Sequence, residues 1–382
     1  MGPVCSHQQS SLFYEACSTG NLEVVQKMLP DLTLEEINQI DSINGNTALH
    51  AACQGNHIEI IRLLLPYSLR TIVNRQGKTA LEMMSITDEL HTLFSRQGTS
   101  ERFVDSSSSI ESFLLKAADG SELNETSHIP DNWQKGYLSA SDANESQFMF
   151  AIARAPRLLK AFIKQRTERE CCEEFRSLLK EIINQEDKQV FNLYDNFLDK
   201  GRIDSLLTLY TLETPLYSVL QNNANAFTAL LFLHLPELFD RAYQGETYRG
   251  ISMTLTDIDA YKWAVQRQDF VLETRTLQST SKKKTVAQGF AGAYDSSLLS
   301  VLITFHFPHK CSTAINLTRV NDKLPPLSNF ADEEEVLLLP FTLFQVRSIN
   351  IDSHTGKYEI ILYNIPVPKK SLLNSWTAIK EK

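Results

Sequence analysis

The sequence predicts a multidomain protein in which an all-α repeat solenoid is followed by an α+β domain. Three observations lead to this fold class: a motif recurs near the start of the chain, a Ser-, Asp- and Gly-rich stretch follows it, and helical periodicities give way to strand patterns after Gly245. The expected boundaries are residues 1–96 for the solenoid, 97–145 for a linker or partly ordered spacer, and 146–382 for the α+β domain.

The repeat is clearest over residues 47–65, where Thr-Ala-Leu-His-Ala-Ala precedes a second apolar helix pattern. Another copy begins at Gly77, and Thr47 and Thr79 lie 32 positions apart, while a degenerate earlier copy starts at Tyr14. This array resembles ankyrin repeats, with alanine replacing the proline of their Thr-Pro-Leu-His-x-Ala signature. The resemblance implies a helical array that either binds a protein partner on its concave face or braces the rest of the chain.

Small residues in the array are expected to let its helices pack closely. Cys17 and Cys53 are therefore predicted to be buried apolar residues without a redox role. Gly55 is predicted to end the helix that Thr47 begins.

Helical periodicity continues beyond the spacer, and Thr214 with Pro215 is typical of an N-cap followed by proline at the first helical position. A short ordered piece is also expected within the spacer, at residues 110–118. The predicted helices cover residues 146–167, 169–184, 189–198, 203–212, 216–221 and 226–243, the last with a break near Pro236. The predicted strands cover residues 300–307, 335–350 and 357–363.

Composition excludes several classes of function. The net charge of −9 argues against a nucleic-acid-binding protein. The six cysteines have no metal-ligand spacing, and neither do His234, His306 and His309, so neither a metal site nor a disulfide framework is expected. The sequence shows no secretory signal and no membrane-spanning stretch, and the protein is expected to be cytoplasmic.

An acidic cluster runs directly into an apolar strand pattern at residues 331–340. In extended backbone Glu333 and Glu335 point to one face and Glu334 to the other, with the strand beginning at Glu335. Two carboxylates on one face suit a reaction in which one stabilises a forming cation and the other acts on a second partner. The alternative interpretation is a solvated acidic loop before a strand.

Two motifs upstream of this acidic cluster form, together with it, a set of three motifs in a fixed order along the chain. Arg249-Gly250 comes first, with Arg249 expected at the end of a strand before a turn; Ser279-Thr280-Ser281 is second and Glu333-Glu334-Glu335 third. In this order the motifs resemble those of the arginine-type mono-ADP-ribosyltransferases. Residues 210–217 and 335–346 are also similar to that family's helical lobe and last catalytic strand. The resemblance covers roughly residues 187–363 and puts the domain core at about residues 187–367.

The resemblance implies NAD+ as a substrate and no metal. Arg249 is expected to bind the NAD+ diphosphate through two parallel hydrogen bonds, and main chain at Gly250 to hold the nicotinamide amide. The alternative for Arg249 is a surface ion pair. Ser279, Thr280 and Ser281 are expected to steady the ribose and the catalytic carboxylate. Phe290 is expected to stack on the nicotinamide ring, or else to be a core phenylalanine.

The two carboxylates receive different roles by the same resemblance. Glu335 is expected to stabilise the oxocarbenium-like cation and Glu333 to orient an acceptor arginine, while Glu334 is a bystander. Leu277-Gln278 departs from the aromatic residue that the family often has before its Ser-Thr-Ser motif. The lysines at positions 282–284 are interpreted either as a solvated loop or as a contact to phosphate or an acidic target.

These expectations together describe an NAD+-dependent protein-arginine mono-ADP-ribosyltransferase whose targets are positioned by ankyrin repeats. The expected partners are a target protein carrying the acceptor arginine and a protein bound on the ankyrin face. Two alternatives remain open: an NAD+ glycohydrolase, in which water is the acceptor, and a non-catalytic ankyrin adaptor.

Overall fold

The structure is a computed structural model that describes residues 6–84, 92–96, 133–135, 168–183, 188–222, 224–265, 270–274, 276–290, 298–340, 342–352 and 356–365. The predicted helix over 146–167 and the ordered piece over 110–118 lie outside these residues. Contacts divide the chain into two compact units. The repeat unit comprises Met1–Thr99, Asn184–Glu213 and Thr318–Asp332, and the sheet unit comprises Ser100–Ile183, Thr214–Leu317 and Glu333–Lys382. This division differs from the sequence boundaries, because two segments expected in the α+β domain group with the repeats.

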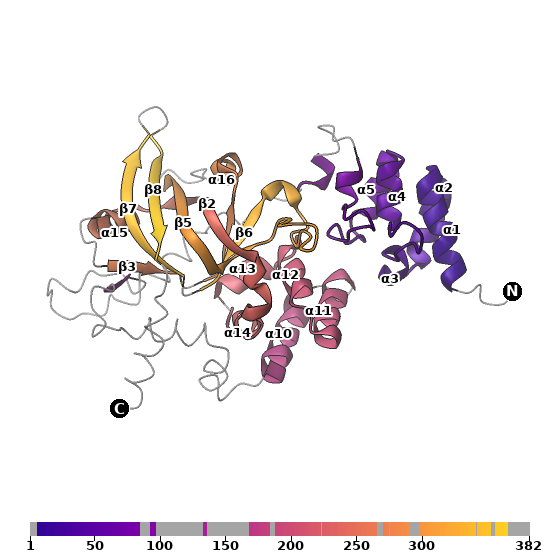
Figure 1. The fold of residues 1–382 in the computed structure, drawn as a ribbon, viewed down its shortest axis with the longest axis horizontal. Coiled ribbons are helices and arrows are strands. Elements are labelled where there is room, and N and C mark those ends of the chain that lie inside the picture. The colour runs from indigo at the N-terminus through magenta and orange to yellow at the C-terminus, as the bar shows by residue number, and fades with distance from the viewer. Residues whose placement is uncertain are drawn as a thin grey trace. The chain divides into compact units, whose positions relative to one another are not determined.

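The repeat unit is helical (Figure 1). Its elements are α1 (Ser6–Thr19), α2 (Leu22–Met28), η1 (Leu29–Asp31), α3 (Leu34–Ile37), α4 (Ala48–Gln54), α5 (Ile58–Leu64), η2 (Leu81–Met83), α11 (Lys188–Lys200) and α12 (Ile203–Thr211). Cys17 and Cys53 are 0% and 2% exposed within the core of the array, which confirms them as buried apolar residues. Burial raises the pKa of the Cys17 thiol to about 12.

The ends of α4 show how the repeat motif builds its helix. The Thr47 side chain accepts from the His50 amide, and Nδ1 of His50 in turn accepts from the Thr47 amide at 3.2 Å. The helix stops at Gly55 as predicted, although Gly55 has a φ of −81° and the left-handed residue is Asn56. A Cβ at Gly55 would lie 2.3 Å from Nε2 of His57, so a larger residue there would require the His57 side chain to move.

Helices of the sheet unit precede and interrupt its strands. They are α10 (Glu168–Ile182), α13 (Leu216–Asn222), α14 (Asn225–Leu233), η5 (Leu235–Arg241), α15 (Leu255–Val265) and α16 (Lys284–Phe290), while the short helix η6 (Ala331–Glu333) begins in the repeat unit and ends at the first residue of the next sheet-unit segment. The Leu216 amide donates to the Thr214 hydroxyl at 3.4 Å, as the predicted N-cap requires. Neither α15 nor α16 was expected, since the sequence after Gly245 was assigned to strands and turns.

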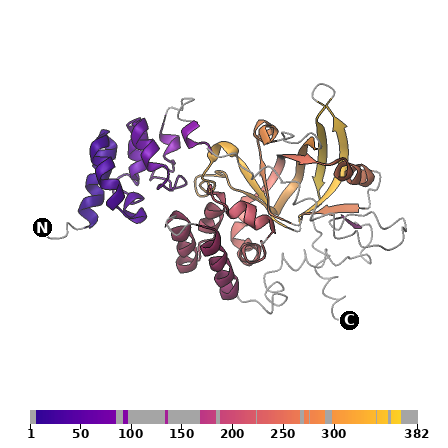
Figure 2. The ribbon, with the colours of Figure 1, turned by 180° about the vertical axis from the view of Figure 1, so that it is seen from behind.

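Eight strands form one sheet in the described part of the sheet unit, in the order β1-β3-β7-β8-β5-β2-β4-β6. Their bounds are β1 (Trp133–Lys135), β2 (Ala242–Met253), β3 (Phe270–Glu273), β4 (Gln278–Ser281), β5 (Leu299–Asn316), β6 (Glu335–Leu338), β7 (Leu343–Ile351) and β8 (Tyr358–Asn364). The strand predicted over 335–350 is therefore two strands. Helix α15 packs against β7, as Figure 2 shows from behind.

The long strand β5 closes part of this sheet on itself. It pairs with β2 continuously from Leu299 to Phe307 and again at Cys311 and Ile315, while Ala314, Ile315 and Asn316 near its end also pair with β6. Because β2 also pairs with β4 and β4 with β6, the strands β5, β2, β4 and β6 form a closed ring of hydrogen-bonded neighbours. The ring fixes the positions of all three motifs singled out in the sequence.

Acidic pH is expected to destabilise the array through His50. Its Nδ1 accepts from the Thr47 amide, so the imidazole is neutral and its Nε2 donates to the Lys78 carbonyl at 3.1 Å. Burial lowers the pKa of His50 below the 6.5 of an exposed histidine. As pH falls below 6.5, the unfolded chain binds a proton at His50 that the folded chain does not bind. The free energy of unfolding therefore decreases.

Amide exchange of the full-length protein checks this prediction. The amides of residues 47–65 should be less protected at pH 5 than at pH 7, once the intrinsic pH dependence of amide exchange is corrected for, because local opening becomes more frequent. His50→Gln, which has no titrating side chain there, should show a smaller pH dependence. Equal pH dependence in the two proteins would contradict the assignment.

Candidate active site

Arg249 lies in the interior of β2 with its side chain buried. The sequence placed it at the end of a strand before a turn, which is wrong, because β2 continues to Met253. The Arg249 guanidinium, in a residue only 1% exposed, donates from Nη1 to the Ser279 carbonyl at 2.7 Å and from Nη2 to the Tyr217 hydroxyl at 3.3 Å. Arg249 therefore holds β4 and α13, and it is not a surface ion pair.

Ser279 links this arginine to the acidic strand. Its hydroxyl donates to Oε1 of Glu335 at 2.6 Å, and both residues are 0% exposed. The register explains the contact: Ser281 lies opposite Glu335 in the β4–β6 ladder, and Ser279, two residues away, points to the same face. One side chain of each of the three motifs thus belongs to a single chain of hydrogen bonds.

The other two hydroxyls of the second motif fasten the neighbouring backbone. The Thr280 hydroxyl donates to the Val336 carbonyl, and the Ser281 hydroxyl donates to the Glu333 carbonyl, each at 2.7 Å. Both therefore act on the acidic segment through its main chain. Their predicted contact with the ribose stays a prediction.

The three glutamates are not arranged by strand alternation. Glu333 ends the short helix η6, Glu334 has a left-handed φ of 43°, and β6 begins only at Glu335. The premise of extended backbone across this segment was therefore wrong. Glu333 and Glu335 are nonetheless both buried, at 4% and 0% exposure, while the Glu334 side chain is 33% exposed.

The lysines after the second motif are engaged inside the sheet unit. Nζ of Lys282 and of Lys283 lie 3.6 and 3.1 Å from the Glu334 carboxylate, and Nζ of Lys284 lies 2.7 Å from that of Glu359. Lys284 also begins α16 rather than lying in a loop. Lys282 and Lys283 thus pair with the Glu334 carboxylate, whose assignment as a bystander stays a prediction.

Gly250 and Phe290 complete the residues predicted for NAD+. Gly250 is buried in β2 opposite Leu302. Phe290 is the last residue of α16. Their contacts to nicotinamide stay predictions.

Tyr217 is the residue that sequence reasoning missed. It lies in α13, is 5% exposed, and contributes the hydroxyl that accepts from Arg249. One signal was available, since Tyr217 belongs to the 210–217 stretch that resembles the helical lobe of the transferases. Its partner is 32 residues away, and no local pattern identifies such a contact.

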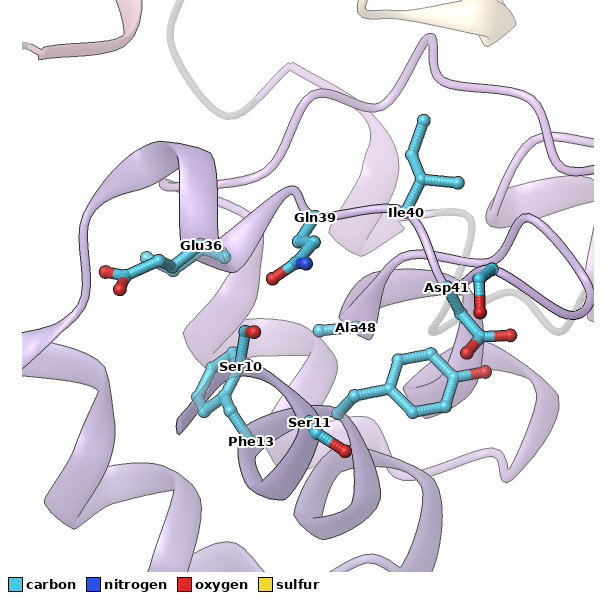
Figure 3. Close-up of a pocket in the computed structure, with 11 residues that line it drawn as sticks. Ser10, Ser11, Phe13, Glu36, Gln39, Ile40, Asp41 and Ala48 are labelled. Carbon is cyan, nitrogen blue, oxygen red and sulfur yellow. The ribbon is translucent and has the colours of Figure 1, made fainter. Parts of the chain in front are cut away.

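A cavity of about 600 Å³ lies in the repeat unit. In Figure 3, Ser10, Ser11 and Phe13 of α1 lie on one side of it and Glu36, Gln39, Ile40 and Asp41 on the other. None of the residues that line it belongs to the three motifs.

The described residues contain no group of His, Cys, Asp and Glu side chains arranged to hold a metal ion. No helix among them has the length and apolar character needed to cross a membrane.

Comparisons with known proteins identify the repeats. Residues 12–93 match the family model for ankyrin repeats in three copies. No curated protein matches the chain. The repeat unit thus carries an ankyrin array, followed along the chain by a mixed α+β unit.

The structure is similar to several solved structures of ADP-ribosyltransferases. Vis toxin, an ADP-ribosyltransferase from Vibrio splendidus, has 19% identity and a TM-score of 0.28, over 53% of this chain and 87% of that chain. ADP-ribosyltransferase HopU1 of Pseudomonas syringae has 17% identity and a TM-score of 0.32, and the match covers 61% of this chain and 100% of that chain. Exoenzyme S from Pseudomonas aeruginosa, solved with carba-NAD, has 15% identity and a TM-score of 0.32, and the match covers 51% of this chain and 90% of that chain.

Loss of the Ser279 hydroxyl is expected to destabilise the sheet unit. Ser279→Ala removes a hydrogen bond to a buried carboxylate, which should lower the free energy of unfolding by roughly 1.5–3 kcal/mol. In a Glu335→Gln background the same change should cost less, because the acceptor is no longer charged. Denaturant unfolding of the four proteins measures the coupling, and strictly additive effects would contradict the buried charge-assisted bond.

Proposed function

We propose that the protein is an NAD+-dependent protein-arginine mono-ADP-ribosyltransferase. The observation that carries the proposal is the chain of contacts from Arg249 through Ser279 to Glu335, which joins three motifs that are separate in the sequence. In the reaction the bond between C1′ of the ribose and the nicotinamide nitrogen breaks, and its electron pair leaves with nicotinamide. A guanidino nitrogen of the target arginine bonds to C1′ and releases one proton.

Glu335 stabilises the cation that forms on the ribose. Bond breaking at C1′ generates an oxocarbenium-like centre, and a fixed carboxylate nearby lowers its energy. The Ser279 hydroxyl and the start of β6 hold that carboxylate before NAD+ arrives. Preorganisation of this kind avoids reorganisation at the moment of reaction.

The donor groups around Arg249 suit a dinucleotide diphosphate. A guanidinium, a glycine main chain at Gly250 and the hydroxyls of Thr280 and Ser281 are all groups that bind phosphate or sugar oxygens. Because Arg249 is 1% exposed, its contact with a phosphate requires an exchange of partner. The hydrogen bond to Tyr217, which is longer than the one to the Ser279 carbonyl, is the contact that we expect NAD+ to replace.

Glu333 gives the site its preference for arginine. Its carboxylate matches the planar guanidinium in charge and in shape, and it can orient the nucleophile and receive its proton. With Glu333 absent, water remains as an acceptor, and the same site acts as a glycohydrolase.

The burial of the site favours one second candidate. Arg249, Ser279 and Glu335 are each at most 1% exposed, as in a purely structural network. A non-catalytic ankyrin adaptor would have such a network without turnover. The assay below separates the two.

The ankyrin array is proposed to bind the target protein inside the cell. Three of its large apolar side chains are exposed, namely Leu12 at 52%, Ile40 at 55% and Ile43 at 81%. Ankyrin arrays commonly use such residues on their binding surfaces.

Labelled NAD+ with agmatine or poly-arginine as acceptor tests the function. The wild-type protein should label the acceptor and release nicotinamide. Glu335→Gln should reduce both by roughly 10²–10³-fold, since it removes the charge that stabilises the cation. Glu333→Gln should abolish labelling while nicotinamide release continues.

Glu334→Gln is the matched control, because it makes the same change in the same segment at the side chain that pairs with Lys282 and Lys283. It should keep both activities. Nicotinamide release without labelling by the wild type would indicate the glycohydrolase. If the folded protein bound NAD+ but gave neither labelling nor nicotinamide release, the result would favour the non-catalytic ankyrin adaptor.

A further inference from the structure

The cavity in the repeat unit (the array cavity) is formed by the ankyrin array alone. Its volume of about 600 Å³ is within the range of pockets that bind ligands. All of the residues that line it lie between Ser10 and Ala48, and therefore in one compact unit. They come from α1, from α3 and the loop after it, and from the start of α4 (Figure 3). The array cavity is thus separate along the chain from all three motifs of the candidate active site.

The walls of the array cavity combine buried apolar side chains with polar groups. Phe13, Ile37 and Ala48 line it and are each at most 3% exposed. The Ser10 hydroxyl and the Gln39 amide belong to the same walls, and in Figure 3 Asp41 lies at one end of the space that the residues enclose. Such a lining suits a long side chain that has an apolar stem and a polar head.

Asp41 offers a fixed carboxylate to such a head group. Its Oδ2 accepts from the amides of Ile43 and Asn44, each at 3.0 Å. Within the part of the chain that the structure describes, no hydrogen bond is donated to its Oδ1. The other carboxylate of the lining, Glu36, caps α3 by accepting from the amide and the hydroxyl of Thr33 at 2.8 and 2.9 Å. Asp41 is therefore held in place with one oxygen left for a ligand.

Asn44 holds an aromatic ring to the same loop. Its Nδ2 donates to the Tyr14 hydroxyl at 3.1 Å, while its amide donates to Asp41. Tyr14 and Asp41 both line the array cavity, so one residue fixes both of them before any partner arrives. An arginine guanidinium stacks on aromatic rings and donates two parallel hydrogen bonds to a carboxylate, whereas a lysine ammonium lacks this planar geometry. The pair therefore favours arginine over lysine.

The charge around the array cavity also favours a cation. Residues 6–48 carry six carboxylates against a single lysine, Lys27. Among the described residues that line the cavity, none is lysine, arginine or histidine. A negative field of this kind steers cationic partners toward the surface. Exposed apolar side chains at Leu12, Ile40 and Ile43, close in sequence to the lining residues, add surface for apolar contacts on a partner.

We propose that the array cavity binds an arginine side chain of the partner protein, with its guanidinium on the Tyr14 ring and the Asp41 carboxylate and its stem against Phe13 and Ile37. Apolar side chains that flank this arginine pack on the exposed residues named above. The inference rests on the proposed function only in taking the partner to be the protein that the transferase modifies. The arginine bound in the array cavity serves for docking and is distinct from the acceptor arginine.

The test is a peptide titration of the full-length protein without NAD+, followed by fluorescence anisotropy. The probe is a fluorescein-labelled peptide, Gly-Ser-Leu-Ser-Arg-Ser-Leu-Ser-Gly, with matched peptides that carry citrulline or lysine in place of arginine. Asp41→Asn removes the charge but keeps an oxygen to accept from the two loop amides. Asp31→Asn is the matched control, because it makes the same change at an exposed residue of the array that does not line the cavity.

The arginine peptide should bind at least about tenfold more tightly than the citrulline peptide, because charge-assisted hydrogen bonds are stronger than neutral ones. The lysine peptide should bind with intermediate affinity. Asp41→Asn should weaken binding of the arginine peptide by about tenfold, and Asp31→Asn should stay within about twofold of wild type. Equal losses in the two variants would indicate general attraction to an acidic surface and overturn the site. Equal binding of the lysine peptide would overturn the preference for a guanidinium.

Amide exchange with and without the arginine peptide locates the binding. Exchange should slow over residues 38–46, where Asp41 and Asn44 lie. Slower exchange confined to residues 333–338 would place the peptide at the acidic motif and overturn docking in the array cavity, as would absence of binding. Because these measurements contain no NAD+, they are independent of the labelled-NAD+ assay. Failure of that assay would overturn the transferase and leave the docking result unchanged.

Discussion

The register between β4 and β6 is the constraint on which the candidate active site depends. Ser281 must lie opposite Glu335 for Ser279 to reach the same carboxylate from two residues away. A slip by one residue would turn Ser279 to the opposite face of the sheet. The hydroxyls of Thr280 and Ser281 bond to main chain on the acidic side and so oppose such a slip. The second motif therefore sets the geometry of the third.

Local patterns in the sequence predicted most of the helices and the ankyrin array. The predicted helices over 189–198 and 203–212 correspond closely to α11 and α12, because their apolar residues recur with the helical period. Helix α15 lacks a clear apolar stripe and was missed. A capping box at its start was available as a signal, since Thr254 and Asp257 bond to each other's amides.

Long-range contacts account for what the sequence left out. The hydroxyl of Tyr217 on Arg249, and the grouping of Thr318–Asp332 with the repeats, join residues whose separation carries no periodic signal. The left-handed backbone at Glu334 was also missed, because glutamate rarely adopts it and no glycine marks the position. The motif residues themselves were identified because their order resembles a known family.

The closed ring of β5, β2, β4 and β6 limits how a target can approach the acidic motif. Both edges of β6 are occupied, by β4 on one side and by β5 on the other, whereas β4 pairs with β6 along its length and with β2 at Ser281. A peptide therefore cannot join the sheet at β6 by β-augmentation, a common mode of recognition through main-chain hydrogen bonds. A peptide that bound beside the acidic motif would therefore be recognised at β6 through its side chains, and β6 would place no constraint on its backbone conformation.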